Sequence, residues 1–296
     1  MLAEPPFRHV ELPDGRVLET VSGGPENGMP LLFQNGTPTA AVLFEPLVDI
    51  AAERGLRTVL YSRPGYAGST PHHGRSVADA ASDIAALLDA DGTDRFVTIG
   101  WSGGGPHALA CAALLPERCA AAVSLAGVAP YGAEGLDWLA GMGPENVEEF
   151  TATLEGEAAL TTYLEAEAGQ VASVHGNDIV ASLGGLIPDV DKASLTGDFA
   201  EYMAYCFRRS VSTGIAGWRD DDLAFAKPWG FELEAITRPV AVWQGGRDLM
   251  VPVAHGEWLA AHIRGAGKHI HKDEGHLSLG VAALPRIVDD LLALAG

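Results

Sequence analysis

The chain is poor in cysteine and in long apolar runs. It has 3 cysteines in 296 residues, an odd number without motif spacing, which argues against a disulfide framework and favours a reducing, cytoplasmic setting. No run of about 18 uncharged apolar residues occurs, so a membrane-spanning helix is not expected. Residues 1–6 lack the basic and apolar segments of a secretory leader, so export is not expected either.

Positive charge is also scarce. The chain holds 19 Lys and Arg against 39 Asp and Glu, a formal net charge of −20, which would repel nucleic acids and anionic lipid surfaces. We therefore expect no nucleic-acid partner and no membrane partner. The hydrophobic content of 47% is enough for the full core of a globular protein, and the sequence leaves a homo-oligomer open.

One stretch organises the rest of the chain. The apolar, β-prone run over residues 96–99 leads into Gly100-Trp101-Ser102-Gly103-Gly104 and then into a helical pattern. This is a Gly-x-Ser-x-Gly elbow, in which the residues two positions from the serine must lack bulk so that strand and helix can pass closely. The motif predicts a strand, a tight turn with an exposed Ser102 hydroxyl, and a helix whose N-terminus favours a developing oxyanion.

Short apolar runs alternate with helical patterns on either side of this elbow. The alternation is typical of right-handed βαβ units and predicts an α/β fold with a mostly parallel sheet flanked by helices. A hairpin around Pro13-Asp14-Gly15 is expected to open the sheet over residues 7–22. The expected strands cover residues 30–34, 57–61, 96–101, 121–126, 239–244 and 269–271, and the expected helices cover residues 41–45, 76–90, 103–115, 253–264 and 281–294.

The alternation stops between residues 131 and 235. This segment shows helical stretches at about 145–169, 177–186 and 198–213, and it carries 19 acidic and 5 basic residues, which is −14 of the net charge. We therefore predict a core formed by residues 1–130 and 236–296, with a helical insertion over 131–235.

Three chemically complementary residues follow expected strands, at the edge where open parallel sheets bind ligands. A serine nucleophile needs a base, and the base needs a carboxylate that fixes its tautomer. We assign these roles to Ser102, His276 and Asp248, with His276 in the loop between the last strand and the last helix. Asp248 is preferred to Asp273 because it lies just past a strand end, and His107 is expected on another face of its helix. The sequence shows no metal-ligand spacing and no dinucleotide motif, so no metal or cofactor is expected.

These features together resemble the α/β-hydrolase superfamily. The resemblance rests on the elbow, the order Ser-Asp-His, Ser62-Arg63-Pro64-Gly65-Tyr66 and Gly245-Gly246-Arg247-Asp248, and it covers nearly the whole chain outside the insertion. It implies an oxyanion hole formed by the N–H groups of Thr37 and Gly103, and it identifies the insertion as a cap domain over the pocket. Asn35 stands where the family usually has histidine, and its side chain is expected to hold the loop by hydrogen bonds.

The resemblance implies a serine hydrolase that cleaves a small carboxylic ester or lactone through an acyl-enzyme on Ser102. A serine at the elbow argues against the dehalogenases and epoxide hydrolases, which use aspartate. Trp101 is a candidate substrate-binding residue. Alternatives are an aminopeptidase resembling proline iminopeptidases, whose elbow usually reads Gly-Gly-Ser-Trp-Gly, and a carbon–carbon bond hydrolase. A lyase, an oxygenase or a ligand receptor on the same fold would be a different class.

Overall fold

Eight strands form one sheet in the order β1-β2-β4-β3-β5-β6-β7-β8. This computed structural model describes residues 6–296; residues 1–5, which belong to the segment expected to lack a leader, lie outside the described residues. The hairpin of β1 and β2 is confirmed, β2 is antiparallel to both of its neighbours, and the remaining pairs are parallel. The strands are β1 (Arg8–Glu11), β2 (Val17–Gly23), β3 (Met29–Gln34), β4 (Leu56–Tyr61), β5 (Phe96–Trp101), β6 (Cys119–Leu125), β7 (Val240–Gly245) and β8 (Gly267–His271).

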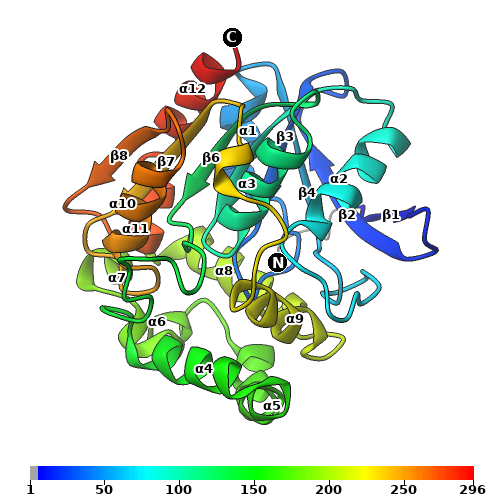
Figure 1. Cartoon of the computed structure of the whole chain (residues 1–296). Helices are drawn as coiled ribbons and strands as arrows, with labels where there is room; N and C mark the ends of the chain where they lie inside the picture. Colours follow the sequence, from blue (N-terminus) through cyan, green and yellow to red (C-terminus); the bar gives the residue numbers. More distant parts are fainter. Residues whose placement is uncertain (1–5) are drawn as a thin grey trace.

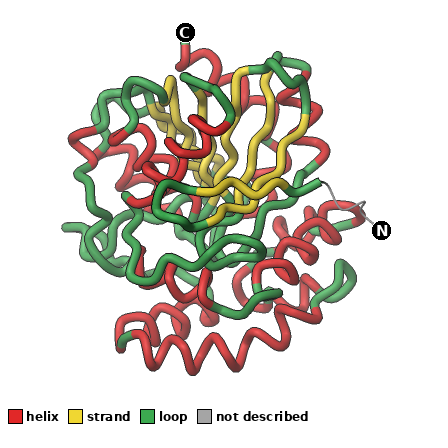
Figure 2. Tube along the Cα trace, turned by 90° about the vertical axis from the view of Figure 1, so that its right-hand side faces the viewer, coloured by secondary structure: helices red, strands yellow, loops and turns green. Residues whose placement is uncertain are grey.

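Helices cover both faces of the sheet, as the alternating pattern predicts (Figures 1 and 2). Leu31 and Phe33 of β3 pack in the layer that holds α1 and α12, whereas Leu32 packs in the layer of α2, α3 and α10. This division follows from the two-residue period of a strand, which points successive side chains to opposite faces. The helices of the core are α1 (Glu45–Ala52), α2 (Asp79–Ala90), α3 (Gly104–Leu114), α10 (Val253–His262), α11 (His276–Ala282) and α12 (Leu284–Ala295).

Helices alone, without a strand, lie between β6 and β7 in the described chain. Figure 1 shows α4, α5 and α6 together at one end of the molecule, away from the C-terminus. The observed helices are α4 (Pro144–Glu155), α5 (Glu157–Ser173), α6 (Ile179–Ser182), α7 (Asp189–Ser194), α8 (Gly197–Ser210) and α9 (Ala216–Phe225), with short 3₁₀ turns at Gly184–Leu186 and Leu233–Ala235. The division into a core and a cap domain stays a prediction.

Several expected helices have different bounds in the structure. The expectation of a helix over 41–45 is wrong: α1 begins at Glu45, where Pro46 occupies a first-turn position that needs no N–H donor. The expected helix over 145–169 is two helices, because Gly156 adopts φ 118° between α4 and α5. The last expected helix, over 281–294, corresponds to α12, which begins at Leu284 with Pro285 in a first-turn position that needs no N–H donor.

No helix within residues 6–296 is both long enough and apolar enough to cross a membrane.

Candidate active site

Ser102 lies at the predicted elbow between β5 and α3. Its backbone has φ 56°, in the left-handed region that residues other than glycine rarely adopt. A Cβ atom at Gly100 would lie 2.1 Å from the carbonyl oxygen of Gly104, and one at Gly104 would lie 2.0 Å from the carbonyl oxygen of Gln34. Both glycines are therefore required by the close passage of strand and helix, which is the physical reason for the motif.

His276 and Asp248 meet beyond the ends of β7 and β8. His276 Nδ1 lies 2.7 Å from Asp248 Oδ2, and both side chains are buried. Asp248 Oδ1 accepts backbone hydrogen bonds from Met250 at 2.9 Å and Val251 at 2.8 Å, so the carboxylate is held from two sides. Because Nδ1–H donates to the carboxylate, Nε2 of the neutral ring is left as the proton acceptor. His276 is the first residue of α11, so the expectation that it lies in a loop is wrong.

The electrostatics of this pair favour a basic imidazole. Burial by itself lowers the pKa of His276, but the charge and hydrogen bond of Asp248 outweigh it, so the pKa of His276 lies above its ordinary value. Burial raises the pKa of Asp248, an effect that its hydrogen bonds to His276 and Val251 only partly offset. The proton between His276 and Asp248 therefore lies on or near the His276 ring.

Ser102 and His276 line one small cavity of about 50 Å³, together with Trp101. Within the described residues no hydrogen bond joins the Ser102 hydroxyl to the ring, a separation that is common before substrate binds. The Trp101 ring lies against His276, with ring centroids 6.0 Å apart and planes at 22°. Trp101 is not part of the lining of the larger cavity described below, and its role in substrate binding stays a prediction.

The two expected oxyanion donors lie next to each other. A Cβ atom at Gly103 would lie 2.5 Å from Thr37 Oγ1, and both residues border the same cavity as Ser102. Gly103 is also the N-cap of α3, so its N–H lies at the positive end of the helix dipole. The arrangement suits an oxyanion hole, and this assignment stays a prediction.

Arg63, rather than Asn35, holds the loop over residues 35–38, here called the oxyanion loop after the expected role of Thr37. The guanidinium of Arg63 donates to the carbonyl oxygens of Asn35 and Gly36 and to Thr37 Oγ1. The side-chain amide nitrogen of Asn35 is buried and has no partner among the described residues. The expectation that the Asn35 side chain holds the loop is therefore wrong, because a buried guanidinium already satisfies the loop carbonyls.

Asp221 of α9 also holds this loop in place, through Thr37 and Arg63. Its carboxylate accepts from Thr37 Oγ1 at 2.8 Å and from Arg63 at 2.6 Å, and it lies 2.7 Å from Arg75. Burial alone would raise the pKa of Asp221, but the two arginines hold it well below its usual range. The loop is thus tied to α9, the helix of the insertion that precedes β7.

Asp191 of α7 fixes the helix that carries His276. It is fully buried, and its carboxylate accepts backbone hydrogen bonds from His276 at 2.9 Å, Leu277 at 3.0 Å and Ser278 at 2.8 Å. A carboxylate at a helix N-terminus satisfies free N–H groups and the helix dipole together. Sequence reasoning missed Asp191, because no local motif marks a contact between residues 85 positions apart.

Two other buried histidines have structural roles. His107 places Nδ1 2.8 Å from the carbonyl oxygen of Gly103 and packs edge-on to Phe225. Both ring nitrogens of His255 contact backbone groups, those of Ala129 and Trp138. No group of three or more metal-binding side chains suited to a metal ion occurs within residues 6–296.

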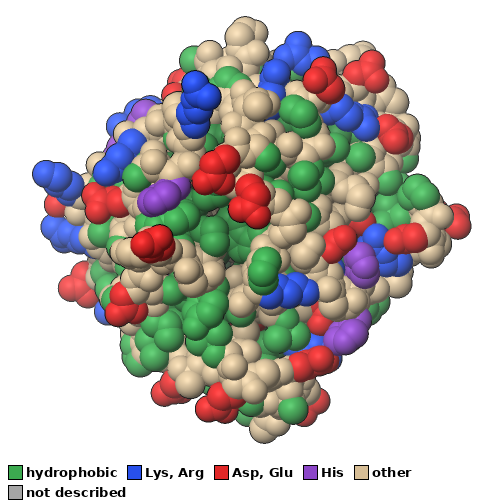
Figure 3. Space-filling view, in the orientation of Figure 1, with side chains coloured by type: hydrophobic (Ala, Val, Ile, Leu, Met, Phe, Trp, Pro, Cys, Tyr) green, Lys and Arg blue, Asp and Glu red, His purple; other side chains and the backbone are tan. Residues whose placement is uncertain are grey.

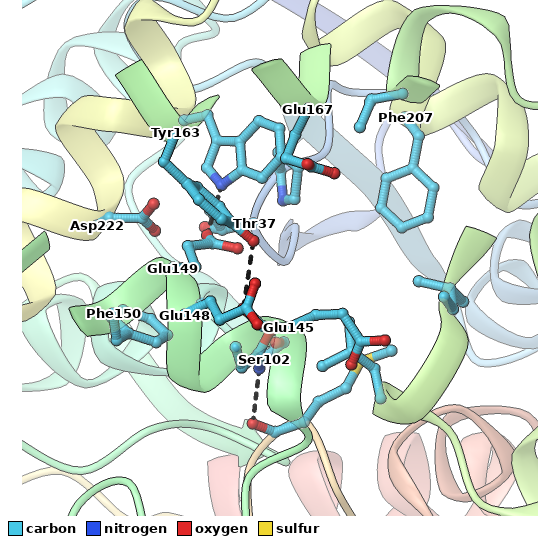
Figure 4. Close-up of a pocket in the computed structure, with 18 of the residues that line it drawn as sticks. Thr37, Ser102, Glu145, Glu148, Glu149, Phe150, Tyr163, Glu167, Phe207 and Asp222 are labelled. Carbon is cyan, nitrogen blue, oxygen red and sulfur yellow. Dashed lines mark hydrogen bonds between the residues drawn. The ribbon is translucent and has the colours of Figure 1, made fainter. Parts of the chain in front are cut away.

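The largest cavity beside Ser102 has a volume of about 230 Å³. Figure 4 shows Ser102 and Thr37 in this cavity together with several acidic side chains from the insertion. Its carboxyl groups are those of Glu145, Glu148, Glu149, Glu167 and Asp222. In Figure 3, acidic and hydrophobic side chains are exposed at the end formed by α4 and α5, and most of the visible Lys and Arg lie over the sheet half.

The sequence pattern of the alpha/beta hydrolase fold family matches residues 29–283. The chain belongs to this family. A non-heme chloroperoxidase from Streptomyces lividans is 30% identical over 245 residues, which cover 81% of this chain and 82% of that protein.

Solved structures of alpha/beta hydrolases share the whole fold. An alpha/beta hydrolase fold protein from Nakamurella multipartita is 26% identical with a TM-score of 0.67, covering 98% of this chain and 100% of its own. The enol-lactonase from Burkholderia xenovorans is 20% identical with a TM-score of 0.66, covering 97% and 100%. At that identity the second comparison shows the fold alone.

Proposed function

We propose that this alpha/beta hydrolase is a serine hydrolase that cleaves a small carboxylic ester or lactone through an acyl-enzyme on Ser102. The observation that carries the proposal is the buried 2.7 Å contact between His276 Nδ1 and Asp248 Oδ2, made beside the cavity into which the strained Ser102 elbow opens. A base oriented in this way serves a serine nucleophile, which is inert without one.

In the first half-reaction, His276 Nε2 takes the proton of Ser102 Oγ as the oxygen attacks the ester carbonyl. The carbonyl oxygen becomes an oxyanion, which the N–H groups of Thr37 and Gly103 stabilise. Removing one such donor in comparable sites costs roughly 2.7–4 kcal/mol. The imidazolium, stabilised by Asp248, then gives its proton to the departing alcohol oxygen, and the acyl group stays on Ser102.

In the second half-reaction, water attacks the acyl-enzyme. His276 takes a proton from this water, a second oxyanion forms in the same place, and Ser102 leaves with the proton returned by the ring. The acid is released, and a lactone opens to a hydroxy acid by the same steps.

The shape of the site and the relatives support this class of substrate. A cavity of about 230 Å³ lies below the range of about 300–1,000 Å³ typical of drug-sized ligands, which favours small esters. An enol-lactonase shares the fold, so the architecture accommodates cleavage of a cyclic ester.

The test is hydrolysis of short-chain p-nitrophenyl esters and small lactones by the wild type and by Ser102→Ala. We expect turnover by the wild type with an initial burst of p-nitrophenol, and a loss of roughly 10³-fold or more in the variant. Ser173→Ala, at an exposed serine of α5, is the control and should retain full activity. Equal rates for Ser102→Ala and the wild type would overturn the proposal.

A further inference from the structure

The cavity beside Ser102 is lined by acidic side chains that no basic side chain of its described wall neutralises. Five carboxyl groups line it, and no Lys, Arg or His is among the described residues of its wall. The pKa of Tyr163 reflects this environment: burial raises it, and four glutamates, including Glu149 and Glu167, raise it further. A substrate that enters this space meets a strongly negative potential, which repels anions and attracts cations.

Asp222 is a buried carboxyl group of the cavity wall that has no basic side chain as a partner. Its side chain is 1% exposed and borders the cavity, and no N–H or hydroxyl group of the described residues reaches either carboxylate oxygen, so the carboxyl group of Glu149 is its hydrogen-bonding neighbour. Figure 4 shows Asp222 beside Glu149, whose Oε1 accepts the indole N–H of Trp218 at 2.7 Å. Burying a carboxylate without a hydrogen bond or a counter-charge is costly, so such a group is expected to be paired.

The nearest arginines do not supply the missing charge. Arg63 and Arg75 both contact Asp221, the neighbour of Asp222 on α9, which points toward the oxyanion loop. Burial raises the pKa of Asp222 well above its ordinary value, and the adjacent Glu149 raises it further, whereas Arg75 has only a minor lowering effect. Because the pKa values of both Asp222 and Glu149 are raised and no counter-cation faces them, we expect the two carboxyl groups to share a proton.

Aromatic rings complete the surroundings of the two carboxyl groups. Phe150, Tyr163 and Trp218 line the same cavity, and Figure 4 shows Tyr163 and Phe150 on the side of Glu149 and Asp222. The faces of aromatic rings attract ammonium groups, most strongly where water is excluded. Carboxylates and rings together form the kind of surface that binds a substituted ammonium ion.

We propose that this cavity is a subsite for a cationic nitrogen, and that the preferred substrates are small esters whose acid or alcohol part carries an ammonium group bound by Asp222 and Glu149. The reaction on such an ester rests on the proposed function, whereas the binding of the cation does not. On binding, the cation replaces the shared proton, which leaves for solvent.

Matched pairs of esters test the subsite. Acetylcholine and 3,3-dimethylbutyl acetate differ only in the quaternary nitrogen or carbon of the alcohol part. Methyl 4-(trimethylammonio)butanoate and methyl 5,5-dimethylhexanoate make the same comparison in the acid. For at least one pair we expect the wild type to favour the cationic ester about tenfold or more in kcat/KM, with the preference declining as salt is added.

The variants Asp222→Asn and Glu149→Gln keep the shape of each side chain and remove its charge. Each should reduce the preference for the cationic ester to about threefold or less, since the low-dielectric attraction is lost. Glu165→Gln is the matched control, because Glu165 lies exposed on α5 outside the cavity wall, and it should keep the wild-type preference.

A binding measurement separates the subsite from the reaction. Calorimetry on Ser102→Ala should show tighter binding of the cationic ester than of its carbon isostere, with proton release that Asp222→Asn abolishes. Cation-selective binding without hydrolysis by the wild type would overturn the proposed function and support the subsite. Equal binding and equal kcat/KM for both members of both pairs, or a preference that survives Asp222→Asn and Glu149→Gln, would overturn the subsite.

Discussion

Asp191 Oδ2 accepts the backbone N–H of His276 at 2.9 Å, so a carboxylate of the insertion holds the candidate catalytic histidine in place. The other carboxylate oxygen of Asp191 accepts from the next two residues of α11. A Cβ atom at Gly275 would lie 2.4 Å from this carboxylate, so the residue before His276 has to be glycine for the contact to form. The insertion therefore helps to position His276, the expected base, and also lines the cavity beside Ser102.

Asp191→Asn should lower activity without abolishing it. An amide offers one acceptor oxygen instead of a charged pair, so the start of α11 and the His276 ring lose part of their support. We expect kcat to fall roughly tenfold, equivalent to about 1.4 kcal/mol in the barrier, with a smaller change in KM. Asp189→Asn changes an exposed carboxylate on the same helix and should have no effect. An Asp191→Asn enzyme with wild-type kcat would contradict the positioning role.

The pH profile of kcat/KM should report the environment of His276. The ring must be neutral to accept a proton, and the facing Asp248 and nearby Asp191 raise its pKa. Activity should therefore rise with pH through a midpoint above the ordinary histidine value of about 6.5. Asp191→Asn removes one negative charge near the ring, so its midpoint should lie below that of the wild type. A midpoint at or below about 6.5 in the wild type, or the same midpoint in the wild type and Asp191→Asn, would contradict this prediction.

Asp221→Asn should destabilise the fold. The substitution leaves the buried guanidinium groups of Arg63 and Arg75 without a counter-charge, and breaking a buried ion pair in this way typically costs about 3–5 kcal/mol. Because the folded-state pKa of Asp221 is lowered, its stabilising effect is present above the unfolded value of about 3.9 and should be complete at pH 7. Urea unfolding measures the loss. The exposed Asp198→Asn is the control, and an equal loss there would show that the ion pair is not the cause.

Asp222→Asn should have the opposite effect on stability. The folded-state pKa of Asp222 is raised, so above the unfolded value of about 3.9 the native state holds a proton that the unfolded state has released, and stability falls as pH rises. Removing the carboxylate removes this cost. The melting temperature of Asp222→Asn should therefore exceed that of the wild type, and the gap should widen between pH 4 and pH 8. Destabilisation at pH 8 would show that the carboxylate supports the fold.

The elements that follow from local pattern could be predicted from the sequence. The elbow was predictable because Gly100 and Gly104 are required by a contact between neighbouring elements, and the parallel strands were predictable from continuous apolar runs. Asp248 and His276 were predictable because both follow strands whose carboxyl ends meet at one edge of the sheet.

The supporting contacts could not be predicted in the same way. Asp191 meets α11, and Asp221 meets Arg63, across more than 80 residues, so their partners depend on how the insertion packs. Residues 220–222 form a run of three aspartates. In the structure its last two members point to different places, one to the arginines and one to the cavity, because successive residues of a helix differ by about 100° in direction.

The most direct test of the central claim is mass spectrometry of the enzyme quenched with acid during turnover of p-nitrophenyl acetate. We predict one acetyl group on the wild type, located on the peptide that contains Ser102, and none on Ser102→Ala. His276→Ala should form this adduct far more slowly, since the nucleophile has lost its base. An active wild type without an adduct, or an adduct that persists in Ser102→Ala, would contradict the account.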